Sequence, residues 1–203
     1  MESCKYCSTD ENSIDYHEII ECITCALDAK DPYTAGHSQR VSDMTLRVCQ
    51  IMGFKDHDIE RIHIAAHLHD IGKIGVPDSV LNKVEPLTDE EWKLIRRHPQ
   101  IGAEILSKST HLSELKDIVL CHHERYDGKG YPDGLKGDDI PIGAQVVALA
   151  DEYDRLVMGR PNKKSVSHEQ AVNMIKDREC GKFNPILVES FLEISDEIKA
   201  RLQ

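Results

Sequence analysis

The residues best suited to chemistry are His69 and Asp70, which are adjacent in the apolar segment AAHLHDIGKIG of residues 65–75. A neutral imidazole nitrogen and a carboxylate oxygen are both good ligands for divalent first-row metals. Adjacent residues on a helix point about 100° apart, so the two side chains can share a metal only where the helix ends, and Gly72 provides that ending. Lys73 places an ammonium group nearby. The segment therefore predicts a metal centre at the end of a helix.

Histidines and one aspartate elsewhere in the chain could complete such a centre. Asp151 interrupts the apolar run of residues 146–150, where a carboxylate is costly unless it is paired or bound to a metal. His98 precedes Pro99, which suits the first position of a new helix, so this histidine is expected at a corner between two helices. Two consecutive histidines precede a glycine-rich loop, whose backbone can approach a ligand closely. The added candidate ligands are His37, His98, His122, His123 and Asp151.

His63 and His67 lie four residues apart on the helix that leads to His69. This spacing can bind a metal, but no carboxylate of matched spacing accompanies the pair. We therefore interpret both residues as ordinary half-buried or surface histidines.

The chain has 203 residues and a net charge of −11, which fits one domain with a proper core. Its acidity argues against general binding to nucleic-acid polymers or to anionic membranes, so the positive charge that holds an anionic substrate must be local. No apolar run approaches the roughly 18–20 residues that span a bilayer, and the amino terminus lacks the basic-then-apolar order of a signal peptide. We expect a cytoplasmic protein.

The seven cysteines are an odd count, which argues against a fully disulfide-paired secreted framework. Four of them form two CxxC pairs, Cys4/Cys7 and Cys22/Cys25, a pattern that can bind zinc or an iron–sulfur centre. The favoured interpretation places Cys22 and Cys25 in the core as small buried side chains. A weaker hypothesis joins the two pairs as a redox- or zinc-sensitive clip. The remaining three are interpreted as structural: Cys49, Cys121 and Cys180.

Apolar periodicity predicts an all-α fold without strands. Residues 1–12 are polar and are expected to form a flexible arm, whereas residues 13–203 are expected to form one domain. Thr88 and Glu91 make a capping box that opens one helix, and residues 72–87 are expected to be a loop. The expected helices cover about residues 13–29, 36–52, 56–70, 89–98, 99–106, 112–123, 142–156, 167–180 and 185–201.

Several motifs together resemble the HD-GYP family, a branch of the HD phosphohydrolase superfamily. The match covers nearly the whole chain from about Ile14, and residues 130–132 are the Gly-Tyr-Pro tripeptide that names the family. The matching motifs are DPYTAGHSQRV at residues 31–41, HDIGKIG at residues 69–75, His98 with Pro99, the segment from His122 to Pro132, and Asp151 before EYD.

The resemblance implies an all-α bundle that hydrolyses cyclic di-GMP at a site with two or three metals. It gives Asp70 and Lys73 catalytic roles: Asp70 would bridge two metals, and Lys73 would sit against the scissile phosphate. It also assigns substrate contacts to Tyr131, Arg160 and Lys163. The metal ligands that it implies are His37, His69, Asp70, His98, His122, His123 and Asp151.

Nitrogen and oxygen ligands in this number, with one bridge, suit two near-octahedral ions better than one tetrahedral zinc, and they favour iron or manganese. Two metals about 3.5–4 Å apart can clamp the attacking and leaving oxygens of a phosphoryl displacement, with a bridging hydroxide as the nucleophile. Hydrolysis would give linear pGpG, GMP or both. Family members with three metals carry a glutamate where this chain has Tyr33, so we expect a binuclear centre.

The segment after Asp151 departs from the family pattern, because residues 154–163 read DRLVMGRPNK. The substrate preference is therefore open between cyclic di-GMP and another cyclic dinucleotide, such as cyclic GMP–AMP. A different class of protein is the alternative: a catalytically weak module that binds the nucleotide, or docks a signalling protein through its Gly-Tyr-Pro loop. The complete ligand set disfavours this alternative. A homodimer of this chain is a further alternative for its partner.

Overall fold

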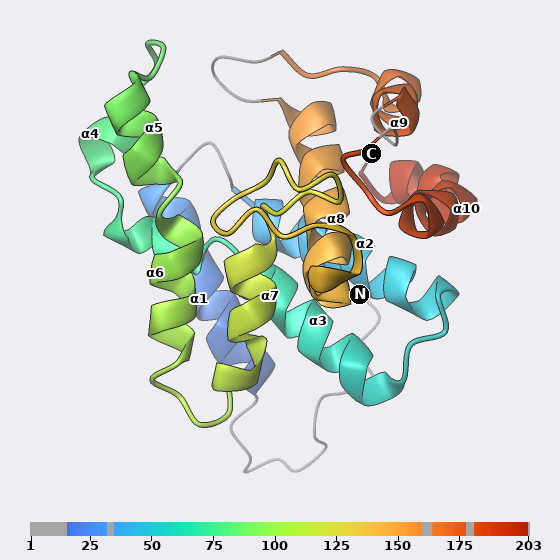
Figure 1. Ribbon diagram of the computed structural model, residues 1–203, viewed down its shortest axis with the longest axis horizontal. Coiled ribbons are helices and arrows are strands. Elements are labelled where there is room, and N and C mark those ends of the chain that lie inside the picture. Colours follow the sequence, from blue (N-terminus) through green and yellow to red (C-terminus); the bar gives the residue numbers. More distant parts are fainter. Residues whose placement is uncertain (1–15, 32–34, 160–163, 178–180, 203) are drawn as a thin grey trace.

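The structure is a computed structural model that describes residues 16–31, 35–159, 164–177 and 181–202, so the expected arm of residues 1–12 lies outside it. Every regular element in these ranges is a helix (Figure 1), which confirms the all-α prediction. None of the described helices is long and apolar enough to cross a membrane. The elements are α1 (Tyr16–Lys30), α2 (His37–Ile51), α3 (Asp56–Leu68), η2 (Ile71–Gly75), α4 (Asp78–Leu81), α5 (Asp89–Ile95), α6 (His98–Leu106), η3 (Ser113–Leu115), α7 (Lys116–Cys121), η4 (Gly137–Asp139), α8 (Ile142–Met158), α9 (His168–Asp177) and α10 (Pro185–Leu202).

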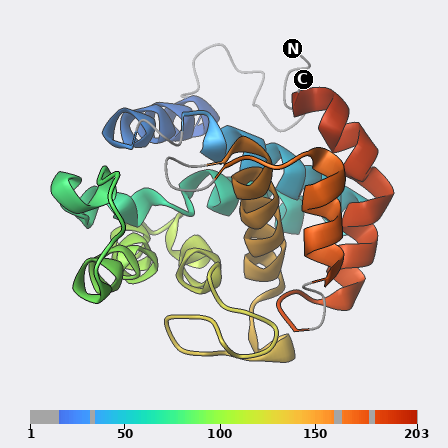
Figure 2. The same ribbon diagram turned by 90° about the horizontal axis from the view of Figure 1, so that it is seen from above.

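Helices α2, α3 and α8 form the centre of the bundle. Helix α2 packs against both α3 and α8, and α7 packs against α8. Seen from above, α9 and α10 (orange and red) lie on one side of α8, and the green helices that precede α7 lie on the other (Figure 2). Apolar side chains that interlock between these helices are completely buried, among them Val41, Leu68, Val146, Val147 and Phe191.

Two helix starts follow directly from the local sequence. Thr88 Oγ1 accepts a hydrogen bond from Glu91 N, and Glu91 Oε2 accepts one from Thr88 N, so the predicted capping box of α5 is confirmed. Ser167 and Gln170 make the same reciprocal pair in front of α9. In both places the side chains satisfy backbone N–H groups that the first turn of a helix leaves without partners.

The loop predicted at residues 72–87 instead contains the short helices η2 and α4. In η2, Lys73 N donates a hydrogen bond to Asp70 O at 2.9 Å. Gly72 permits a close approach between elements, because an added Cβ would lie 1.9 Å from the carbonyl oxygen of His98 on α6. Helix η2 therefore rests directly on the start of α6, which places Asp70 beside His98.

Two predicted helices are shorter in the structure. The helix expected to end near residue 70 ends at Leu68, and the helix expected over residues 112–123 is divided into η3 and α7, which ends at Cys121. His69 keeps helical backbone angles, and the chain leaves them at Asp70, whose φ is −96° and ψ is 6°. This change of backbone angles lets neighbouring residues in the sequence point at the same place.

The prediction that Cys22 and Cys25 are buried is wrong, because both lie exposed on α1. The buried face of α1 is formed by Ile20, Thr24 and Leu27. Their spacing of three and four residues defines one face of the helix, and the two cysteines lie outside it.

The other cysteines divide between buried and undescribed positions. Cys49 and Cys121 are buried, which agrees with a structural role, and burial raises the pKa of both thiols to about 12. Cys4, Cys7 and Cys180 lie outside the described residues. The cysteine clip therefore stays a prediction.

Candidate metal centre

The candidate ligands from the sequence come together at one place in the bundle. His37 begins α2 and Asp151 lies in the middle of α8, whereas the others follow the ends of α3, α5 and α7. Six of them form two groups, in each of which the donor atoms lie within 4.8 Å of one another. The first group is His37, His69 and Asp70, and the second is His98, His122 and His123.

Asp70 lies between the two groups. Its Oδ1 is 3.2 Å from His98 Nε2, while its Oδ2 is 3.4 Å from His69 Nε2 and 3.9 Å from His37 Nε2. Asp151 joins the first group, because its Oδ1 is 3.2 Å from His37 Nε2. One carboxylate with an oxygen toward each group is the arrangement that a bridging ligand requires.

Three imidazoles are oriented by backbone carbonyls at the ends of helices. The Nδ1–H groups of His69, His98 and His122 donate to the carbonyl oxygen three residues earlier, at 2.6, 2.7 and 2.6 Å respectively. The last carbonyls of a helix have no partner within it, so they are available as acceptors. Each bond fixes the tautomer and leaves the Nε2 lone pair for the centre, as in metal-ligating histidines generally.

His37 is oriented by a carboxylate instead. Its Nδ1 lies 2.7 Å from Asp154 Oδ2, and Arg40 holds the same carboxylate through Nε at 2.6 Å and a terminal nitrogen at 3.1 Å. Burial lowers the pKa of His37, but the nearby carboxylates of Asp151 and Asp154 outweigh burial and raise it to about 8. Asp154 is therefore the positioning partner of His37, a role that the sequence analysis missed.

The second group consists of neutral imidazoles at pH 7. Burial lowers the pKa of His122 to about 3, and burial also lowers the pKa of His98 and His123. A neutral imidazole has a lone pair to offer, whereas an imidazolium has none. These three side chains are therefore in the protonation state that metal binding needs.

The two carboxylates are ionised despite their burial. Burial acts to raise the pKa of Asp70, but Lys73 and His69 outweigh it and hold the value well below the usual range. Burial acts on Asp151 in the same sense and is outweighed by Arg155 and His37. Both residues therefore offer anionic oxygens to the centre.

The residues present fit a bound metal. The Nε2 atoms of His37 and His69 are buried and have no hydrogen-bond partner among the described residues. Buried polar atoms nearly always have a partner. A divalent cation held by these nitrogens and by the neighbouring carboxylates would supply it.

Lys73 lies at the edge of the centre and is buried. Its Nζ is 2.8 Å from Asp70 Oδ2 and 3.0 Å from Asp31 Oδ2. The sequence marks Asp31 only as part of a helix break and of a motif, and its contact with Lys73 becomes visible in the structure. The ammonium group is thus held next to the carboxylate that the two ligand groups share.

A cavity of about 300 Å³ opens beside the second ligand group. Tyr131 lines it and stacks on His123, with ring centres 4.8 Å apart. The guanidinium carbon of Arg96 lies over the Tyr131 ring, 5.4 Å from its centre. The predicted contacts Arg160 and Lys163 lie outside the described residues. The cations that line the cavity are Arg96, Arg125, Lys129, Arg155 and Lys182.

The fold and the histidine–aspartate centre define the class of protein. The model of the HD domain family matches residues 21–187, so the chain belongs to the HD domain family. The resemblance to HD-GYP proteins that the motifs indicated is confirmed.

Curated relatives are similar over most of this chain. It is 40% identical over 183 residues to a cyclic di-GMP phosphodiesterase of Thermotoga maritima, covering 89% of this chain and 50% of the relative. It is 36% identical over 185 residues to 3'3'-cGAMP-specific phosphodiesterase 2 of Vibrio cholerae, covering 90% of this chain and 35% of the relative. The chain thus spans half or less of the length of these two proteins.

A solved structure shares the fold. A cyclic GMP-AMP specific phosphodiesterase of V. cholerae superposes with a TM-score of 0.68 at 18% identity, covering 88% of this chain and 48% of the other. At this identity the likeness concerns the fold alone.

Substitution of Asp154 tests the positioning of His37. We expect Asp154→Ala to lower the metal affinity about 10–100-fold, the usual cost of losing a partner behind a metal-ligating histidine. Metal content after dialysis against a weak chelator measures this effect. Asp139→Asn, at an exposed position, is the control. Equal metal retention in both variants would show that Asp154 does not position a ligand.

The interpretation of His63 and His67 as half-buried or surface residues is wrong. His63 is 7% exposed and His67 is 0% exposed, and both pack against His17. Burial lowers the pKa of His67 to about 3 and also lowers the pKa of His63. The spacing in the sequence indicated this pair, but the contact with His17 on α1 is formed only in the folded chain.

Proposed function

We propose that this chain is a metal-dependent phosphodiesterase that hydrolyses a cyclic dinucleotide, with cyclic di-GMP as its first substrate. The observation that carries the proposal is Asp70, placed between two histidine groups beside a cavity lined by cations. The names of the two curated relatives support the reaction type and leave both cyclic di-GMP and 3'3'-cGAMP as candidates.

In this proposal two divalent ions, iron or manganese, occupy the centre, since mixed imidazole and carboxylate ligands suit these metals. When bound, they would supply Lewis-acid stabilisation of the phosphoryl group and an activated water. Tyr33, on which the expectation of two ions rather than three depends, lies outside the described residues. The proposed ligands are His37, His69, Asp70, His98, His122, His123 and Asp151.

The side chains around the metals have separate proposed roles. Lys73 stabilises the charge that develops on the phosphoryl oxygens, because a cation fixed in a buried site acts strongly there. Asp70 holds Lys73 and would also hold the metals. Asp154 and Arg40 keep His37 in its ligating orientation.

The cavity supplies the substrate contacts in this proposal. Ligand pockets usually measure about 300–1,000 Å³, so a cavity of about 300 Å³ fits one half of a dinucleotide and leaves the other outside. The stacked Tyr131 and the cation of Arg96 suit a base and a phosphate respectively. Because the chain carries a net charge of −11, such local cations must hold the anionic ring.

Turnover assays test the function. Protein loaded anaerobically with Mn²⁺ or Fe²⁺ is incubated with cyclic di-GMP, 3'3'-cGAMP and linear pGpG, and the products are separated by chromatography. We expect metal-dependent hydrolysis of at least one cyclic dinucleotide, with cyclic di-GMP giving the highest kcat/KM. Binding without hydrolysis by fully loaded protein would instead favour the sensing or docking module.

Substitution of Arg96 tests the substrate cavity. A charge-assisted contact contributes roughly 1.5–3 kcal/mol, so we expect Arg96→Ala to raise KM for cyclic di-GMP about 10–100-fold. The value of kcat should change little, because the contact exists before and during the reaction. The family resemblance predicts the same effect, a raised KM with little change in kcat, for Arg160→Ala and for Lys163→Ala.

Arg97→Ala provides the matched control, since Arg97 is exposed, adjacent in sequence and not part of the cavity lining. Steady-state kinetics at two salt concentrations compare the variants. The cavity assignment fails if Arg96→Ala and Arg97→Ala give the same KM and the same salt dependence.

A further inference from the structure

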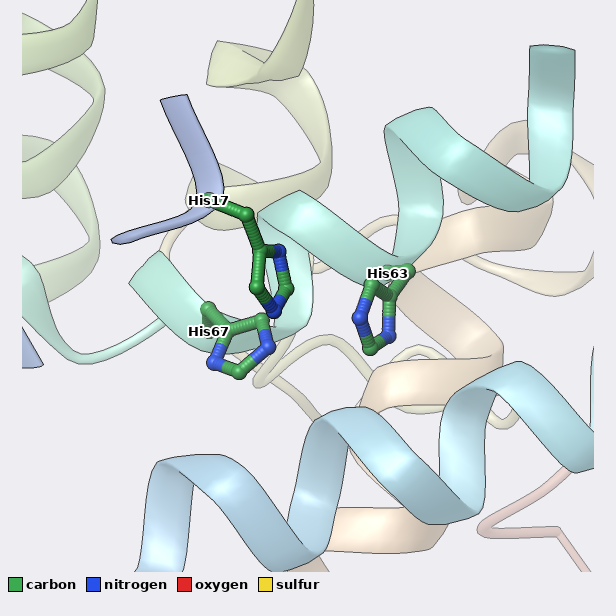
Figure 3. Close-up of side chains that lie close together, drawn as sticks. All are labelled: His17, His63 and His67. Carbon is green, nitrogen blue, oxygen red and sulfur yellow. The ribbon is translucent and has the colours of Figure 1, made fainter. Parts of the chain in front are cut away.

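Three histidines that are not candidate ligands of the metal centre gather between α1 and α3. His17 projects from α1 toward His63 and His67, which both lie on α3 (Figure 3). His67 contacts His17 on α1 and Ser42 on α2, whereas His69 contacts His37 in the candidate metal centre.

The three rings are close enough to share one ion. The ring centres of His63 and His67 are 4.8 Å apart, and His17 lies 5.5 Å from His63 and 5.1 Å from His67. One ring nitrogen from each residue lies within 4.8 Å of the other two. Nitrogens on a tetrahedral zinc at about 2.0–2.1 Å are roughly 3.3 Å apart, so small side-chain rotations would close the site.

Hydrogen bonds to Ser42 on α2 fix the tautomers of two of these histidines. Ser42 Oγ donates its single proton to Gln39 O at 2.9 Å, so it accepts from His67 Nε2 at 2.9 Å. His63 Nδ1 donates to Ser42 O at 3.2 Å. His67 Nδ1 and His63 Nε2 therefore carry the lone pairs. Metal-ligating histidines are commonly held by such a bond at the other ring nitrogen.

Burial leaves one ring nitrogen of this pair without a hydrogen-bond partner among the described residues. His67 is fully buried, and its Nδ1 has no hydrogen-bond partner in the part of the chain that the structure describes. Buried polar atoms without partners are rare and call for an explanation. Neutral imidazoles favour zinc, copper and nickel over harder ions such as magnesium or calcium. A cation of the zinc class would bind where the three rings meet.

We propose that His17, His63 and His67 form a second metal site, for Zn²⁺, which ties α1 to α3. Glu21 follows His17 by one helical turn, and its Oε1 lies 3.4 Å from His17 Nε2. Its carboxylate can supply a fourth ligand after rotation, and water is the alternative. The site uses no proposed ligand of the other centre, so it stands or falls independently of the proposed phosphodiesterase activity.

Zinc binding by the full chain without an affinity tag tests the proposal. Metal-free protein is titrated with Zn²⁺ against a chromophoric chelator under reducing conditions. Wild type is expected to bind one Zn²⁺ more per chain than His17→Asn, or to bind that ion at least about tenfold more tightly. Zinc should also raise the melting temperature of wild type more than that of the variant, because ligand binding stabilises the folded state.

Three further variants make the result specific. His57→Asn changes an exposed histidine at the start of α3 and should bind zinc like wild type. His17→Glu supplies a carboxylate ligand and should restore part of the affinity lost in His17→Asn. Cys22→Ser should leave the extra zinc in place. Equal zinc binding by wild type and His17→Asn overturns the proposal. Loss of the extra zinc in Cys22→Ser but not in His17→Asn also overturns it, because the ion would then depend on the cysteine.

Discussion

Asp70→Ala is expected to abolish turnover and to remove most of the bound metal. Asp70 Oδ1 lies 3.2 Å from His98 Nε2 and Oδ2 lies 3.4 Å from His69 Nε2, so the residue serves both ligand groups. Loss of a hydrogen-bond partner behind a metal ligand lowers metal affinity roughly 10–100-fold. Loss of a ligand that serves two ions should lower it further. Elemental analysis after anaerobic purification measures the metal, and cyclic di-GMP turnover measures the rate.

Two companion variants separate ligation from folding. Asp70→Asn keeps the size of the side chain and one neutral oxygen, so we expect partial metal content and a strongly reduced rate. Asp139→Asn is the exposed control and should match wild type in both measurements. If Asp70→Ala retains full metal content and full activity, the proposed centre is in the wrong place.

The fold was predictable where its signals are local. Apolar periodicity depends on a few neighbouring residues, and the Thr88 capping box spans a single turn. The candidate ligands could also be selected from sequence, because a carboxylate such as Asp151 inside an apolar run needs a partner. Their convergence could not be derived from spacing, since residues 37 and 151 meet only after α2 packs on α8.

Contacts that depend on packing between distant elements could not be predicted from the sequence. Asp154 follows Asp151 by three residues and therefore lies on the same face of α8, a signal that could have marked it. Its partner Arg40 lies 114 residues away in the chain, and no local pattern connects them. Arg96 likewise reaches the cavity only because it lies over Tyr131 of the glycine-rich loop.

Burial was the least predictable property. Cys22 was expected in the core and is exposed, whereas His67 was expected near the surface and is fully buried. Both residues lie on amphipathic helices, and a shift of one position around such a helix exchanges core and solvent. The helices that pack against α1 and α3 determine which face of each is buried, and the sequence of one helix does not give the positions of its neighbours.

Lys73→Gln is expected to lower the rate of hydrolysis about 10²–10³-fold while the metal content stays near that of wild type. This range is the cost of removing one fixed donor that stabilises developing negative charge. Lys73 Nζ lies 2.8 Å from Asp70 Oδ2, so the cation is held at the carboxylate that both ligand groups share. Steady-state turnover and elemental analysis on the same preparation measure the two quantities.

Lys73 also has a structural contact, and a second variant separates the two roles. Its Nζ lies 3.0 Å from Asp31 Oδ2, and both side chains are buried. Removing one partner of a buried ion pair typically costs about 3–5 kcal/mol, so Lys73→Gln should unfold at lower denaturant concentration. In Asp31→Asn/Lys73→Gln the second carboxylate charge is removed as well, and we expect stability to recover while the rate stays low. Recovery of wild-type turnover in the double variant would mean that Lys73 acts through folding and not through the reacting phosphate.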